Sequence, residues 1–368
     1  MFSGFVETGY HATPGEIAKE KVLKQTSGGA SLQYHGNRLK LGMNGYFTLF
    51  DKTLLGSDDL YKRYSFAGNE LAGTSVDYRY LADRTQLFGE ASYSNASVAT
   101  INGFLFFIRP EITIGALHRY YQKGYYSYYA NAFSENSTVA NENGFFLGGE
   151  LQFRNYRIRM YGDVFSFPWL KYRVNMPSEG YEYFAEIGRK MDNSDFYFRY
   201  KRQIKPENYY ESEEFKDVRD LLKEQFRFNG IYSVTEKLTL QNRIEISRAA
   251  FKDKRNNFGF LVFQDIVYRQ MTFPLDVSFR IAYFNTSDYN ARIYAYERDV
   301  LYSYGSRMHY GKGWRFVCML KWKPLKYLTF WFRISQSLYP GEKEIGNGLN
   351  QIQSNHKTEV KIQSIVRF

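Results

Sequence analysis

Short segments in which apolar and polar side chains alternate recur along this chain and constrain its fold more than any other feature. Alternate residues of a β-strand point to opposite faces, whereas a helix turns by about 100° per residue and would scatter such sets around its axis. The alternation therefore predicts an all-β protein. The clearest cases are residues 328–338, 275–283, 238–247 and 156–165.

The two faces of these segments differ in a way that a water-soluble fold does not explain. In residues 328–338, Leu328, Phe330, Phe332 and Ile334 share one face, and Arg333 lies on the other. A soluble sandwich or closed barrel needs the apolar face inside, and charges in almost every segment would then be buried. Aromatic residues make up 19% of the chain, yet mean hydropathy is −0.50. This combination is typical of a transmembrane antiparallel up-and-down β-barrel.

Turn residues divide the chain into about eight hairpins, which with two terminal strands predict about eighteen strands in a single barrel domain over residues 1–368. Long polar loops alternate with the tight turns, as extracellular loops alternate with periplasmic turns. Residues 14–24 and 211–224 have the composition of short helices within such loops. The predicted tight turns lie at 36–37, 83–84, 109–110, 155, 192–194, 235–237, 272–274 and 323–325.

The chain ends on an alternating strand whose last residue is aromatic. Phe368 and Val366 share its apolar face, as in the C-terminal signal that the barrel-assembly machinery reads. The alternative is an ordinary edge strand that ends in Phe. We expect residues 2–10 to supply the first strand and to pair with the last one. The start of the chain lacks signal-peptide features, so we expect an upstream segment in the native protein. The predicted location is the bacterial outer membrane, among its lipid and lipopolysaccharide.

The net charge of +11 suits either a nucleic-acid-binding protein or a basic channel, and the alternating aromatics favour the channel. Two interpretations of the charged faces stay open at this point. The charges form a mutually paired wall, or they attract anions into a water-filled lumen. The residues that we predict to line the lumen are Arg157, Arg159, Asp163, Arg199, Lys201, Arg243, Arg280 and Arg333.

No motif indicates an enzyme, a cofactor or a metal site. Nucleophile-elbow, zinc-protease and phosphate-loop patterns are absent from the sequence, and the five His residues are scattered without metal-ligand spacing. The single cysteine, Cys318, is expected to be a small wall residue. We therefore predict no catalytic residue, no cofactor and no metal.

One predicted outer loop is a candidate for ligand binding. It carries Trp169, Lys171, Tyr172 and Arg173, and exposed aromatic and basic side chains can bind sugars, peptides or nucleic acid. Packing of the loop within the protein is an equally good interpretation.

Several motifs resemble the outer-membrane β-barrel region of a Bacteroidetes family of helix-hairpin-helix domain-containing proteins. The similar segments are 131–135 with 141–144, 167–173, 293–297 with 300–303, and 345–349. The resemblance implies a barrel over roughly residues 28–368. The helix-hairpin-helix segment, which suggests DNA contact in that family, is absent from this sequence, and no catalytic residues are carried over.

The function that these patterns favour is a pore or translocation channel for an anionic or polymeric substrate. The alternative is a non-conducting subunit that docks other outer-membrane or periplasmic proteins. Contact with nucleic acid is left open.

Deletion of Phe368 is expected to impair assembly, because it removes the aromatic residue of the terminal signal. The measurement is the fraction of the chain that reaches the outer membrane in a folded, heat-modifiable form. Insertion at the wild-type level would show that Phe368 is not part of a signal.

Overall fold

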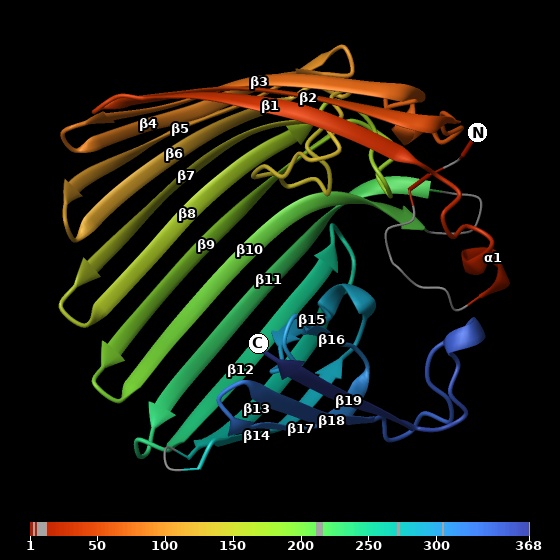
Figure 1. The fold of residues 1–368 in the computed structure, drawn as a ribbon. Helices are drawn as coiled ribbons and strands as arrows, with labels where there is room; N and C mark the ends of the chain where they lie inside the picture. Colours follow the sequence, from red (N-terminus) through yellow and green to blue (C-terminus); the bar gives the residue numbers. More distant parts are fainter. Residues whose placement is uncertain (3, 6–12, 211–215, 271–272, 304, 368) are drawn as a thin grey trace. The chain divides into compact units, whose positions relative to one another are not determined.

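The computed structural model describes residues 1–2, 4–5, 13–210, 216–270, 273–303 and 305–367 (Figure 1). This part of the chain forms nineteen strands and four short helices, and seventeen of the strands belong to one sheet. The helices are α1 (Pro14–Ile17), η1 (Leu60–Lys62), η2 (Tyr289–Ala291) and η3 (Gly348–Asn350). None of these helices is long and apolar enough to span a membrane.

The chain divides into two compact units, and strands β7–β11 contribute residues to both of them. Unit 1 comprises Met1–Leu151, Tyr161–Glu182 and Lys205–Asp220, and unit 2 comprises Gln152–Met160, Tyr183–Ile204 and Leu221–Phe368. The shared strands are β7 (Glu142–Phe153), β8 (Tyr156–Phe167), β9 (Ser178–Met191), β10 (Ser194–Tyr210) and β11 (Lys216–Ser233).

Unit 1 contains a meander in which each strand pairs antiparallel with the next along the chain. Its strands are β1 (Gln25–His35), β2 (Leu39–Leu54), β3 (Gly68–Ala82), β4 (Thr85–Ser94), β5 (Ser97–Arg109), β6 (Ile112–Tyr121) and β7 (Glu142–Phe153).

Unit 2 continues the same pattern from β11, with one interruption. Between β14 and β17 the chain forms a separate two-stranded hairpin, β15–β16, which is not part of the large sheet. The strands are β12 (Leu238–Phe251), β13 (Asn257–Arg269), β14 (Leu275–Thr286), β15 (Ile293–Tyr296), β16 (Ser306–His309), β17 (Lys312–Leu325), β18 (Leu328–Leu338) and β19 (His356–Val366).

The two faces of the strands are exposed in the opposite sense to those of a soluble protein. On β18, Phe332 is 41% exposed, whereas the adjacent Arg333 is 1% exposed. The same inversion occurs on β12, where Ile244 and Ile246 are exposed and Glu245 is buried. Large apolar side chains at a protein surface are favourable in contact with lipid and unfavourable in contact with water. The chain therefore has the fold of a transmembrane antiparallel β-barrel, as the alternation predicts.

The tight turns agree with the sequence at all but one position. Seven of the eight predicted turns fall between paired strands, although Thr272 lies outside the described residues. The turn predicted at residues 323–325 is wrong, because β17 continues to Leu325 and the chain reverses at residues 326–327. The pairing register shifts between Trp322 and Leu325 instead. A bulge accommodates Pro324, which has no backbone N–H to donate to a ladder.

Residues 216–224 form a strand, where the sequence predicts a short helix. From Leu221 onward β11 pairs with β12, and these inter-strand hydrogen bonds outweigh a weak local preference for helix. Residues 211–215 of the same prediction lie outside the described residues. The other predicted helix is present but short, since α1 ends at Ile17.

The two ends of the chain are described only in part. β19 pairs with β18 as far as Val366, and Phe368 lies outside the described residues. Of the predicted first strand, residues 3 and 6–10 also lie outside them, and Phe2 forms a parallel bridge with Leu54. The first described strand is β1, so eight hairpins and β19 account for the seventeen strands of the sheet. The pairing of residues 2–10 with the last strand stays a prediction.

Candidate functional site

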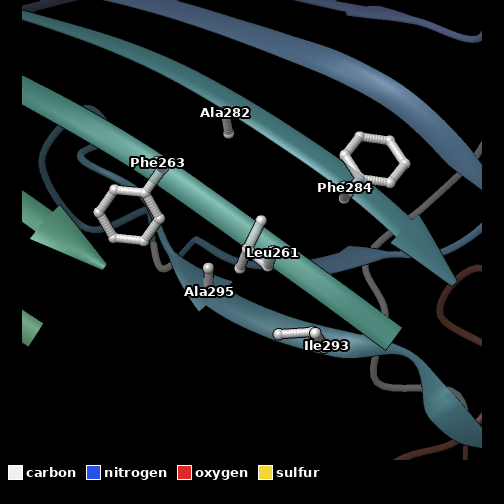
Figure 2. Packing of buried hydrophobic residues seen from close by; sticks show 6 residues of the cluster. All are labelled: Leu261, Phe263, Ala282, Phe284, Ile293 and Ala295. Atoms are coloured by element: carbon white, nitrogen blue, oxygen red, sulfur yellow. The ribbon is translucent and has the colours of Figure 1, made fainter. Parts of the chain in front are cut away.

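The face of the sheet that carries the charged residues, here called the polar face, is covered in unit 2 by the segment between β14 and β17. This inner segment spans residues 287–303 and 305–311 and contains η2, β15 and β16. Its apolar side chains Ile293 and Ala295 are fully buried against residues of β13 and β14. Figure 2 shows these contacts, with Leu261 and Phe263 on one strand and Ala282 and Phe284 on its neighbour.

The inner segment approaches the sheet so closely that a glycine is required at one point. A Cβ atom on Gly259 of β13 would lie 2.2 Å from the carbonyl oxygen of Ala291. The Ser247 hydroxyl of β12 donates a hydrogen bond of 2.5 Å to the same oxygen. Any side chain at position 259 would therefore push η2 away from the sheet.

Arginines from three strands donate hydrogen bonds to the backbone of the inner segment. Arg243 on β12 donates to the carbonyl of Tyr294 at 2.9 Å, and Arg280 on β14 donates to that of Tyr296 at 2.6 Å. Arg333 on β18 donates to the carbonyl of Arg298. A fourth arginine, Arg315 on β17, binds the side chain of Glu297 in the same segment. Hydrogen bonds from a charged donor are about twice as strong as neutral ones, which fixes the segment in one position.

Glu297 is the acidic centre of this arrangement. Its two carboxylate oxygens accept from Arg315 at 2.5 and 2.8 Å and from Arg333 at 2.8 Å, and all three side chains are buried. Burial opposes the ionised form, but the hydrogen bond from Arg315 and the surrounding arginine charges hold the pKa of Glu297 below its ordinary value. Nearby, Asp299 pairs with Lys361 on β19 at 2.8 Å.

His309 is the one buried ring of the inner segment that forms no hydrogen bond in the described part of the chain. It lies edge-on to Phe284, with the ring centroids 5.2 Å apart. Burial lowers the pKa of its imidazole to about 4, although the charge of Glu297 acts in the opposite direction. The ring is therefore neutral at pH 7 and packs as an apolar group.

Unit 1 contains a second buried ion-pair centre, built around Arg119 on β6. Its guanidinium donates to Glu142 at 2.5 Å and, with both terminal nitrogens, to Asp163 at 2.8 and 3.0 Å. All three side chains are at most 2% exposed. Gly144 makes room for the guanidinium, because a Cβ there would lie 2.4 Å from its central carbon.

Glu142 also fixes the 122–141 loop, which connects β6 to β7. Its carboxylate accepts backbone N–H groups of Glu135 and Asn136 at distances of 2.8–3.0 Å. Tyr121 donates its hydroxyl proton to the carbonyl of Phe133 at 2.8 Å. Hydrogen bonds to the buried carboxylate of Glu142 and from the hydroxyl of Tyr121 thus hold the loop against the polar face.

A third charged cluster, in unit 2, is open to solvent on one side. Glu186 on β9 accepts from Arg159 on β8 at 3.1 Å and from Arg199 on β10 at 2.6 Å, and Arg157 lies 3.8 Å away. The carboxylate of Glu186 is only 1% exposed, whereas the side chains of Arg157, Arg159 and Arg199 are 35%, 39% and 26% exposed. Three cations therefore meet solvent above one covered anion.

The structure groups the residues that the sequence predicts to line a lumen into open and covered sets. Arg157, Arg159 and Arg199 surround Glu186, and Lys201 lies two residues farther along β10. Arg243, Arg280, Arg333 and Asp163 occupy the polar face as predicted, but they are at most 7% exposed. They do not line open water, because the inner segment covers the three arginines and Arg119 covers Asp163.

The outer-loop candidates lie between β8 and β9 and are held to different degrees. Trp169 donates its indole N–H to the carbonyl of Leu60, and its backbone N–H donates to the side chain of Asn141 at 2.8 Å. Lys171 lies 3.5 Å from the ring centroid of Phe167, and burial lowers the pKa of its ammonium to about 8. Tyr172 and Arg173 are exposed. Trp169 thus links three loops. Tyr172 and Arg173 are the candidates of this loop that are open to a ligand.

Sequence reasoning missed the partners that fix the loops: Arg119, Glu142, Glu297 and Arg315. The motifs at 141–144 and 293–297 contain Glu142 and Glu297, and a glutamate in an otherwise aromatic or amide-rich loop was the available signal. Within the described residues, no group of three His, Cys, Asp or Glu side chains has the arrangement of a metal site.

Comparison with known proteins shows similarity at the level of the fold. No protein-family model and no curated protein matches the chain. Among solved structures, the FrpB iron transporter of Neisseria meningitidis is similar over 94% of this chain and 63% of its own, with 12% identity and a TM-score of 0.51. The siderophore receptor PiuA and OccAB3, both of Acinetobacter baumannii, cover 93% and 92% of the chain at 9% and 13% identity. The similar region spans 67% of PiuA, with a TM-score of 0.45, and 92% of OccAB3, with a TM-score of 0.41.

The likeness to FrpB agrees with the strand pairing and with the exposed apolar face described above. Together they give the chain the fold of bacterial outer-membrane β-barrels, and the location that this fold implies is the outer membrane.

Substitution of Arg119 by Gln is expected to release the 122–141 loop. The change leaves Glu142 and Asp163 buried without a cation, which costs about 3–5 kcal/mol for a broken buried pair. Limited proteolysis should then cleave within residues 122–141, where the wild-type loop resists. Arg119→Lys, which keeps the charge but not the forked geometry, should give an intermediate rate. Equal protease resistance in all three proteins would contradict the role of Arg119.

Docking of the inner segment is expected to weaken as the pH falls from about 6.5 to about 5, above the range in which Glu297 titrates. A detached His309 has an ordinary pKa near 6.5, so the detached form binds a proton more readily than the docked form. The stabilisation is complete above about pH 6.5 and falls by about 2 kcal/mol at pH 5. Hydrogen exchange of residues 287–311 measures the effect, and His309→Phe should abolish it. A pH dependence that survives this substitution would exclude His309 as its source.

Proposed function

We propose that this chain is an outer-membrane channel that favours anionic solutes. The observation that carries the proposal is the cluster at Glu186, where three partly exposed guanidiniums surround one covered carboxylate. A second carboxylate, Glu245, accepts hydrogen bonds from Arg227 and Arg243, although the inner segment covers Arg243. Five cations therefore share two anions on neighbouring strands, and the surplus charge faces the side that a barrel encloses.

The surplus charge is large enough to affect selectivity. In water, one unit charge acting over ~10 Å contributes about 0.4 kcal/mol, so three such charges contribute about 1.2 kcal/mol at low ionic strength. This energy corresponds to roughly a sevenfold enrichment of monovalent anions and an equal depletion of cations, hence about a fiftyfold preference for anions over cations. A preference of this size is enough to select anions among small ions. In a charged polymer the attraction adds up over many charges, so an anionic polymer is also a suitable substrate.

The inner segment supports a second candidate function, a non-conducting subunit that docks other proteins. Four arginines and a buried apolar cluster hold the segment firmly over the polar face of β12–β18. A segment fixed in this way would narrow a lumen, and a barrel closed by it would serve as a scaffold for outer-membrane or periplasmic partners.

Ion selectivity in planar bilayers tests the channel proposal, with two opposite changes at one site. The wild-type protein should conduct and prefer chloride over potassium in a salt gradient. Arg157→Gln, Arg159→Gln and Arg199→Gln combined should reduce that preference by up to about fiftyfold, because chloride loses an attraction and potassium loses a repulsion. Glu186→Gln removes the covered anion and should increase it.

Folding is checked by heat-modifiable mobility, and the Arg157→Gln single variant gives a smaller change in the same direction if the triple variant does not fold. A conducting protein whose selectivity is the same in every variant would overturn the role of these arginines. A folded wild-type protein that is silent and purifies with stoichiometric partners would favour the docking subunit.

A further inference from the structure

Unit 1 contains a cavity that the proposed channel function does not use. It has a volume of about 340 Å³ and lies between the polar face of β2–β5 and the 122–141 loop. Ligand pockets in proteins have volumes of about 300–1,000 Å³, so the cavity has room for a small molecule. Its walls combine tyrosine rings with hydroxyl and amide groups, and the chemistry of these walls indicates what it can bind.

Tyrosines form the apolar part of the cavity. Tyr121 and Tyr125 are buried with Ala99 in one cluster, and the rings of Tyr46 and Tyr129 meet edge to face with centroids 5.8 Å apart. The Tyr46 ring lies over Gly73, where a Cβ would come within 2.3 Å of it. Tyr129, which comes from the loop, keeps more than half of its surface exposed. Exposed ring faces of this kind bind the C–H face of a flat, partly polar molecule.

Uncharged polar groups form much of the rest of the wall, and hydrogen bonds already orient them. The hydroxyls of Ser92 and Tyr125 share a hydrogen bond of 2.9 Å, and the side-chain amide of Asn44 donates to Ser75 at 3.2 Å. Each hydroxyl keeps further capacity to donate or accept a hydrogen bond. A ligand with several hydroxyl groups matches this wall better than an apolar one.

The charge of the cavity distinguishes it from the arginine cluster at Glu186. Glu90 is the charged residue among those that line the cavity, and it has no hydrogen-bond or ion-pair partner in the described part of the chain. An unpaired carboxylate repels anions and accepts two hydrogen bonds from neighbouring hydroxyl groups. The solutes that the arginine cluster attracts are therefore disfavoured here.

The wall formed by the loop is preorganised. Glu142 binds the backbone of Glu135 and Asn136, and Tyr121 holds the carbonyl of Phe133. These contacts fix the 122–141 loop on the side of the cavity. A ligand therefore does not have to order the loop when it binds, which increases affinity.

We infer that this cavity is a binding site for a neutral saccharide. A sugar presents C–H groups on its ring face and hydroxyl groups around its edge, which correspond to the tyrosines and to the polar wall. The cavity belongs to the polar face, away from the apolar surface that meets lipid, so its ligand is a soluble mono- or disaccharide. The inference is independent of conduction, because none of the residues that line the cavity belongs to the arginine cluster at Glu186.

Saturation-transfer difference NMR on the full chain tests the inference, in a detergent without a sugar headgroup. The probes are four neutral disaccharides: maltose, cellobiose, lactose and chitobiose. At least one should receive magnetisation from the protein, with its ring protons strongest. Tyr129→Ala should weaken that binding by about tenfold or more, and Glu90→Gln should weaken it by a smaller factor.

Tyr302→Ala is the matched control, because Tyr302 is also an exposed loop tyrosine but lies in unit 2, outside the cavity. It should leave binding unchanged, and glucose 6-phosphate should bind more weakly than the neutral probe. The inference is overturned if none of the four disaccharides binds the folded wild-type protein. It is equally overturned if Tyr129→Ala and Tyr302→Ala bind as the wild type does. Bilayer conductance does not enter this test, so its outcome is separate from that of the channel proposal.

Discussion

The pairing of arginines with carboxylates on one face of the sheet is the interaction on which the rest of this structure depends. Many strands place one or more charged residues on the polar face, and isolated charges there would be costly to cover. Arg119, Arg280, Arg315 and Arg333 are each paired with an acidic side chain at 2.5–2.8 Å. Because the pairs are satisfied, chain segments can pack over them. The opposite face is left apolar and is satisfied by lipid.

The same pairing gives different results at different places on the sheet. Where the acid comes from a loop, as Glu297 does, the ion pair anchors that loop to the wall. Where the acid lies in the wall beneath its partners, as Glu186 does, the arginines stay partly in solvent and leave a positive surface. Charges that anchor chain segments and charges that stay partly in solvent therefore coexist in one protein, and exposure separates them better than residue type does.

Much of this architecture could be predicted from the sequence, because strand periodicity and turn chemistry are local. The alternation around Arg333 and the turn at Asp83 follow from neighbouring residues alone. The inner segment could not be predicted in this way. Its position depends on Glu297 meeting Arg315 and Arg333, which are 18 and 36 residues away. Pro324 shows a limit of predicting turns from residue type. A proline there predicts a turn, but a bulge accommodates it within β17.

Attachment of a fluorophore to the single cysteine tests the orientation of the two faces most directly. Cys318 lies on β17 opposite Ile334 of β18, on the apolar face. In liposomes, a label at Cys318 should be quenched by brominated lipid and not by aqueous iodide. A label at residue 159, introduced as Arg159→Cys in a Cys318→Ser background, should be insensitive to brominated lipid. Quenching by lipid at residue 159 and by iodide at residue 318 would contradict the assignment of the polar face to the inside of the barrel.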